Sequence, residues 1–246
     1  MTELLLIGGP TVRIRYAGLT FLTDPTFDPP GDYDGRVILH KLTGPALTVE
    51  EVGPVDAVLL SHDEHADNLD HLGRALLADV PVVLSEPGAA ERIPGVTGLE
   101  PWASTRVGDA TVTAVPALHG PEGCEPITGI VTGFVLQADG EPTVYVSGDN
   151  ASVEIVGEIA GRFPIDIALL FTGAGNVGAF GDTDITLNRR TAVQAARLLG
   201  DALVVPAHAD GWDHFTETRE SLARAFEYAG LGDRLVLLEH GVTTEL

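Results

Sequence analysis

The chain has 246 residues, of which 14 are lysine or arginine and 36 are aspartate or glutamate, so its formal charge at pH 7 is −22. Hydrophobic residues make up 44% of the sequence and charged residues 20%, which is typical of a globular protein and argues against disorder. An acidic surface repels phosphate backbones and anionic headgroups, so nucleic acids and membranes are poor partners. We expect a small-molecule substrate, and a homo-oligomer stays open.

The single cysteine, Cys124, excludes an intramolecular disulfide framework. The first residues lack the basic region of a secretory signal, and no segment reaches the about 18 apolar residues that a membrane-spanning helix needs. These features predict a cytoplasmic protein with a single domain over residues 1–246.

The first half of the chain runs from a hairpin of strands into alternating strand and helix. Residues 12–24 alternate in polarity and predict a β-hairpin, and residues 25–35 predict a loop because proline, glycine and aspartate dominate them. Residues 55–60 are apolar apart from Asp56, which predicts a buried strand, and a helix over 69–77 and a strand over 81–85 follow.

The second half repeats this order. Residues 105–120 and 127–150 predict a β-meander with a turn at Asp139–Gly140. Alternating elements then follow, with helices over 152–163, 191–200 and 218–230 and strands over 165–171, 202–208 and 234–241. The pattern therefore predicts an α/β fold built from two similar halves.

Side chains of the kind that bind zinc follow five separate predicted strands. They are Asp24, the pair His62 and His65, His119, Asp149 and His208. Any one of these histidines taken alone is more often an ordinary buried or surface residue, at roughly three to one. Five strand ends in agreement argue against coincidence, because sites of open sheets lie where strands end at one edge. Imidazole and carboxylate ligands without thiolate suit Zn²⁺, Mn²⁺ or Fe²⁺ in a catalytic site.

These segments together resemble the metallo-β-lactamase fold superfamily, in particular metal-dependent hydrolases similar to ascorbate-6-phosphate lactonase and N-acyl-phosphatidylethanolamine phospholipase D. The matching motifs, in order, are LTDP at Asp24, LLSHDEHADN at 59–68, ALHG at His119, SGDN at Asp149 and PAH at His208. The resemblance covers nearly the whole chain, and it implies a four-layer αββα sandwich with the site at one edge of two facing sheets.

The second motif departs from the family pattern H-x-H-x-D-H. Read from the strand, His62 takes the first histidine position and one extra residue follows it. Read from the helix, His65 takes the second histidine position, Asp63 falls on the first, and Asn68 replaces the final histidine. We favour His62 over Asp63 as the first ligand, because neutral imidazole binds Zn²⁺ well and a local bulge can absorb one residue.

The resemblance implies two metal sites that share one carboxylate. The first would be formed by His62 or Asp63, His65 and His119, and the second by Asp67, His208 and Asn68, with Asp149 bridging. One or two Zn²⁺ ions are the expected cofactor, with Mn²⁺ or Fe²⁺ as alternatives.

Two polar residues receive weaker roles in this scheme. Asn68 offers only an amide oxygen, which binds Zn²⁺ less well than imidazole, so the second site would bind zinc weakly, prefer Mn²⁺ or stay empty. Asp24 would orient a ligand through a hydrogen bond.

The expected chemistry is hydrolysis of an ester, lactone or phosphodiester bond by metal-activated water. Asp67 is the residue we expect to orient that water or act as its base. His214, in the segment GWDHF, is expected to bind substrate or stabilise a developing oxyanion, although a structural place at a helix N-terminus is equally favoured.

Two other functions compete with this one. The altered second motif favours a protein that binds metal but has lost catalysis and serves as a binding module. A nuclease of the same superfamily is disfavoured, because such an enzyme needs a cationic surface or a further substrate-binding domain.

Overall fold

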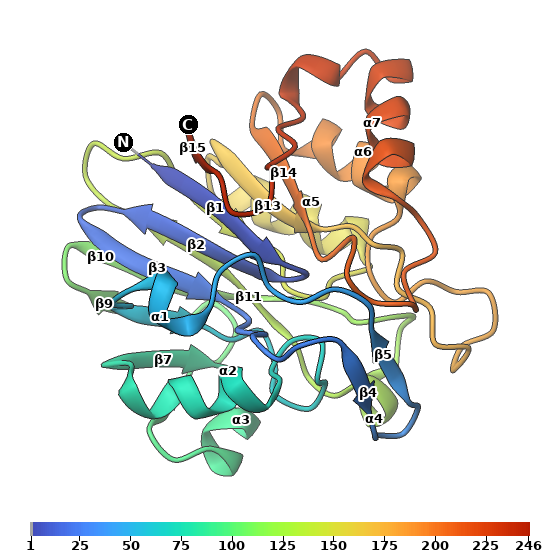
Figure 1. Ribbon diagram of the computed structural model, residues 1–246. Coiled ribbons are helices and arrows are strands. Elements are labelled where there is room, and N and C mark those ends of the chain that lie inside the picture. Colours follow the sequence, from blue (N-terminus) through green and yellow to red (C-terminus); the bar gives the residue numbers. More distant parts are fainter. Residues whose placement is uncertain (1) are drawn as a thin grey trace.

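Two β-sheets lie face to face in the structure, a computed structural model that describes residues 2–246 (Figure 1). In spatial order, the strands of the first sheet are β15 (Thr243–Glu245), β1 (Glu3–Gly8), β2 (Thr11–Tyr16), β3 (Leu19–Thr23), β6 (Ala57–Leu59), β7 (Val82–Ser85) and β8 (Val96–Gly98). Those of the second sheet are β14 (Leu203–Ala207), β13 (Ile167–Phe171), β12 (Val144–Val146), β11 (Thr132–Gln137), β10 (Ala110–Pro116) and β9 (Ser104–Val107).

Each sheet joins an antiparallel meander to parallel strands. In the first sheet β1, β2 and β3 are antiparallel neighbours, and β3, β6, β7 and β8 then run parallel. In the second sheet β9 to β12 are antiparallel, and β12, β13 and β14 run parallel. The two halves that the sequence predicts are therefore present, one in each sheet.

Helices cover the outer faces of both sheets (Figure 1). The short helices α1 (Val49–Val52), α2 (His71–Leu76) and α3 (Pro87–Arg92) lie beside the first sheet, and α5 (Val153–Arg162), α6 (Arg189–Leu198) and α7 (Arg219–Tyr228) beside the second. Three apolar clusters result, one between the sheets and one under each helical layer. The predicted four-layer αββα sandwich is confirmed.

Strand β13 is continuously apolar because of its position in the middle of the sandwich. Ile167, Leu169 and Phe171 belong to the cluster between the sheets, and Ala168 and Leu170 belong to the cluster under the helices. Successive side chains of a strand point to opposite faces, and both faces are covered here. The strand therefore contains only apolar residues, and polar residues follow only after it ends.

The helices of the second half begin at polar caps close to the predicted positions. Ser152 accepts a hydrogen bond from the backbone N–H of Ile155 and starts α5. Thr218 forms a capping box with Ser221 and starts α7. Helix α6 begins two residues before the predicted range, because Asn188 supplies its cap.

The predicted loop over 25–35 is only partly correct. Its last residues form β4 (Gly31–Tyr33), which pairs with β5 (Leu39–Lys41) as a separate hairpin. Composition favours a loop because glycine and aspartate are rare in strands. Tertiary contacts override it: Tyr33 donates a hydrogen bond to Asp28, and the buried ammonium of Lys41 lies 2.9 Å from Asp70 in an ion pair.

The predicted last strand over 234–241 is wrong. A short 3₁₀ turn covers Gly232–Arg234, and the following residues make only two isolated bridges, Val204 with Leu235 and Leu6 with His240. These bridges belong to different sheets, so the segment crosses from one sheet to the other and cannot pair along its length with either. The last strand, β15, comes only after this crossing.

The remaining helical segments are brief. They are α4 (Glu125–Thr128) and a 3₁₀ turn over Leu77–Asp79, which continues from α2. Helices α5, α6 and α7 have 10 residues each. No helix among residues 2–246 is long and apolar enough to cross a membrane.

Candidate metal centre

Strand ends from both sheets deliver polar side chains to one edge of the sandwich. Asp24 follows β3 and His62 lies just beyond β6, both in the first sheet. His119, Asp149 and His208 follow β10, β12 and β14 of the second sheet. All five side chains are almost fully buried. Six residues fall into two groups of converging ligand atoms, which share Asp149: His62, His65, His119 and Asp149 form the first, and Asp67, Asp149 and His208 the second.

The first group is built around three imidazole rings. The Nε2 atom of His62 lies 2.9 Å from the Nδ1 atom of His65, and that atom lies 3.3 Å from the Nε2 atom of His119. A zinc–nitrogen bond of about 2.0–2.1 Å in a tetrahedral site places neighbouring nitrogens about 3.3 Å apart. The spacing of the three rings therefore fits a metal ion.

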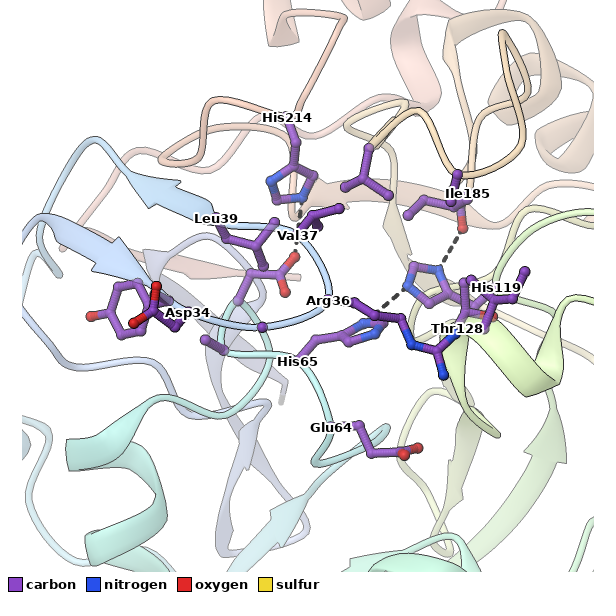
Figure 2. A pocket seen from close by; sticks show the side chains of 17 residues that line it. Asp34, Arg36, Val37, Leu39, Glu64, His65, His119, Thr128, Ile185 and His214 are labelled. Atoms are coloured by element: carbon purple, nitrogen blue, oxygen red, sulfur yellow. Dashed lines mark hydrogen bonds and ion pairs between the residues drawn. The ribbon is translucent and has the colours of Figure 1, made fainter.

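Contacts behind the rings set their orientation. Figure 2 marks the contact between the ring of His119 and the carbonyl oxygen of Ile185 with a dashed line. The Nδ1 atom lies 2.7 Å from that oxygen, so this nitrogen donates and leaves Nε2 free to bind a metal. The hydroxyl of Ser61 lies 2.9 Å from the Nδ1 atom of His62. The backbone N–H of Ser61 in turn donates to Asp24. Asp24 thus contacts the residue that orients His62 rather than a ring itself.

The second group joins two carboxylates to one imidazole. The Nε2 atom of His208 lies 3.3 Å from the Oδ2 atom of Asp67 and 3.4 Å from the Oδ1 atom of Asp149. His208 adopts a left-handed backbone conformation, with φ of 50°, which turns the chain sharply after β14. The spacing is again that of ligands around a small cation.

Asp149 connects the two groups. Its Oδ1 atom faces His208, and its Oδ2 atom lies 3.4 Å from the Nε2 atom of His119. Oδ2 is buried without a hydrogen-bond partner, as are Oδ1 of Asp67 and Nε2 of His208. Buried polar atoms are almost always satisfied, so these orphaned atoms fit the ligands of metal ions.

The pKa values of the buried residues at the site shift in different directions. Burial holds the pKa of His62 well below its ordinary value, which keeps the ring neutral, as a metal ligand must be. Burial opposes protonation of His208 too, but the charge of Asp149 outweighs it and raises the pKa to about 10. Burial raises the pKa of Asp24 to about 8.

The structure places Asp63 and Asn68 differently. The carboxylate of Asp63 is outside both groups, because Arg92 and Arg74 bind it at 2.5 and 3.3 Å. Asn68 is fully buried beside the second group, where its amide nitrogen lies 3.4 Å from the Oδ1 atom of Asp149. Its amide oxygen is buried with no hydrogen-bond partner.

A cavity of about 290 Å³ opens onto the two groups (Figure 2). His65, Asp67, His119 and His214 line it, whereas His62, Asp149 and His208 are not part of its wall. The Nε2 atom of His214 lies 3.1 Å from the Oδ2 atom of Asp67. The imidazoles of His208 and His214 thus lie 3.3 and 3.1 Å from one oxygen of Asp67, and these contacts keep its pKa well below the ordinary value although burial alone would raise it.

Comparison with known proteins identifies the family. A model of the beta-lactamase superfamily domain matches residues 20–209, a span that includes every member of both groups. The chain belongs to the metallo-β-lactamase superfamily. A relative from Methanosphaerula palustris, named UPF0173 metal-dependent hydrolase, is 30% identical over 183 residues, or 70% of this chain and 76% of the relative. A protein of the same name from Methanoculleus marisnigri is 32% identical over 199 residues, or 78% of this chain and 82% of the relative.

Solved structures of this superfamily share the fold. An isothiocyanate hydrolase from Delia radicum gut bacteria has a TM-score of 0.85 and 24% identity, with 99% of this chain and 98% of that chain covered. The sequence relatives, with the paired groups of ligand atoms, identify this chain as a metal-dependent hydrolase.

Three groups that orient residues in and beside the site were not predicted from the sequence. Ser61 directly precedes His62 in the motif, so its place beside a ligand could have been suspected. The Ile185 carbonyl carries no sequence signal, because it is a backbone group 66 residues from His119. Arg92 is equally hidden, since only the folded chain brings helix α3 beside Asp63.

Proposed function

We propose that this superfamily member hydrolyses a carboxylic ester or lactone with water activated at two adjoining metal ions. The observation that carries the proposal is the position of Asp149, whose two oxygens face the two groups of ligand atoms. When bound, divalent ions there supply a Lewis acid and lower the pKa of coordinated water. His62, His65 and His119 would hold one ion, and Asp67, Asp149 and His208 the other.

Asp67, His214 and Asn68 have further roles in the proposed reaction. Asp67 stays ionised, and its Oδ1 atom is unpartnered, so it suits a metal ligand that also orients the attacking water. His214 lies on the cavity wall and is held in place by Asp67, from where it can donate a hydrogen bond to charge that develops on the substrate. Asn68 would complete the second site through its amide oxygen, with Zn²⁺ as the metal we favour.

Apolar side chains make a carbonyl substrate a better fit than a phosphodiester. Val37, Leu39, Ile127, Val177 and Ile185 line the cavity. A phosphodiester carries a negative charge that apolar walls do not solvate, whereas a carboxylic ester or lactone is neutral. The same small apolar cavity would also accept an isothiocyanate, the substrate class named for the solved relative, so an aryl isothiocyanate belongs in the substrate panel.

Replacement of His119 by alanine is expected to lower hydrolysis of the best substrate by at least about 100-fold, because it removes a metal ligand. The measurement is initial rate over a panel of p-nitrophenyl esters, lactones, bis-p-nitrophenyl phosphate and phenethyl isothiocyanate. His40→Ala is the matched control, since His40 is half-exposed and outside the cavity. A rate unchanged in His119→Ala would contradict the proposal.

A pair of neighbouring substitutions tests which residue begins the first metal site. His62→Ala should lower bound metal by about one equivalent, because a ligand is lost. Asp63→Asn should leave metal content unchanged and cost about 1 kcal/mol of stability through its half-exposed arginine partners. Metal analysis of both purified variants gives the answer. Loss of metal from Asp63→Asn alone would reverse the assignment.

A further inference from the structure

The cavity over the metal centre has one cationic wall residue. Arg36 lies between β4 and β5 and is the only lysine or arginine among residues 2–246 that lines this cavity. Figure 2 shows its side chain running from the hairpin loop across the cavity in the direction of Thr128. Arg36 is therefore placed where a substrate has to pass or bind.

Arg36 has no partner in the part of the chain that the structure describes. No hydrogen bond or ion pair joins its guanidinium to any of residues 2–246. Its charge is therefore available to a ligand, in a chain with 36 acidic and only 14 basic residues. Acidic neighbours do not neutralise it: Asp34 and Glu64 line the same cavity without an ion pair to it, and Glu64 lies 3.8 Å from Arg92 instead.

The rest of the wall opposite the metal-binding side chains is apolar. Ile127 and Val177 face the cavity from other segments of the chain, and Val37 and Leu39 come from the same hairpin as Arg36. A substrate bound there would meet the metal-binding side chains at one end, apolar walls along its body and one guanidinium. The volume of about 290 Å³ limits it to a small molecule.

We propose that Arg36 selects substrates that carry a carboxylate, joined by a short apolar chain to the ester or lactone bond that is cleaved. The inference rests on the proposed function, of which it names the substrate class. A guanidinium offers paired donors that match the two oxygens of a carboxylate. One unpaired arginine balances one negative charge, which suits a carboxylate better than a doubly charged phosphate. In a strongly acidic protein, this local cation also offsets the repulsion that an anionic substrate meets.

Two esters whose acyl chains differ only by a terminal carboxylate test the selection. The metal-loaded enzyme should prefer mono-p-nitrophenyl glutarate over p-nitrophenyl butyrate. Arg36→Ala should lower kcat/KM for the glutarate ester about 10- to 100-fold and change the butyrate ester less than about twofold, because only the charge-assisted hydrogen bonds are lost. Arg36→Lys should recover part of the preference. Equal losses on both esters, or no loss on either, would overturn the proposal.

A matched variant controls for net charge. Arg197 is exposed near the end of α6 and does not line the cavity, so Arg197→Ala removes the same charge elsewhere. Its effect should be less than about twofold on both esters, because exposed charges at a distance are screened.

A binding measurement separates this proposal from the proposed function. Calorimetric titration should show glutarate binding at least about 10-fold more tightly than butyrate to the wild-type enzyme, with the difference lost in Arg36→Ala. If neither ester is hydrolysed but this difference appears, ester hydrolysis is wrong and the role of Arg36 stands. If both esters are hydrolysed but glutarate shows no advantage that depends on Arg36, the role of Arg36 is wrong and the hydrolase remains.

Discussion

Asp149→Asn is expected to abolish both metal binding and hydrolysis, with a loss in kcat of at least about 1,000-fold. The carboxylate faces His119 with one oxygen and His208 with the other, so a single substitution reaches both groups. Asparagine keeps the shape but removes the negative charge that would offset two adjoining cations. Loss of one shared ligand therefore weakens two sites, whereas loss of His119 weakens one directly.

Metal content and activity should be measured on the same preparation of Asp149→Asn. Bound metal is expected to fall below about a tenth of an equivalent. Asp109→Asn is the matched control, because the Asp109 side chain is 95% exposed and does not line the cavity. Circular dichroism would establish that the variant is folded. Full metal content together with full activity in Asp149→Asn would disprove the bridging role.

Lys41→Met is expected to destabilise the protein by about 3–5 kcal/mol, because it leaves one partner of a buried ion pair without its counter-charge. The ammonium of Lys41 lies 2.9 Å from Asp70, and the two side chains are 4% and 0% exposed. Asp70 also caps α2 by accepting a hydrogen bond from Gly73. This pair therefore ties the β4–β5 hairpin, which carries Arg36, to the helix that follows the second motif.

Urea unfolding of the metal-loaded protein measures this loss, with Arg15→Met as control. Arg15 pairs with Glu3 at 3.2 Å, but its side chain is 55% exposed, so the control should cost at most about 1 kcal/mol. The double variant Lys41→Met, Asp70→Asn should recover part of the loss, because no isolated charge remains and asparagine still caps a helix. A Lys41→Met variant as stable as the control would refute the buried-pair argument.

Regular elements with strong local patterns were predictable. Strand β13 is apolar on both faces, and α5 and α7 begin at serine and threonine caps that their sequences display. The crossing segment over 234–241 was not, because its apolar residues resemble those of a strand although its partners change midway. The β4–β5 hairpin was missed for the opposite reason, since contacts remote in sequence stabilise residues with poor strand propensity.

The ligand types, and the strand ends that carry them, can be read from the sequence alone. That information is local, because an apolar run followed by histidine or aspartate marks where a buried strand reaches the edge of a sheet. Which of these ligand atoms converge depends on how the strands and helices pack. Asp63 and His62 are adjacent in the chain, yet Arg92 from α3 binds Asp63 while the ring of His62 meets His65. Arg92 lies 29 residues from Asp63, and Ile185 lies 66 residues from His119. Contacts of this kind decide which side chain faces the metal centre, and no local sequence pattern encodes them.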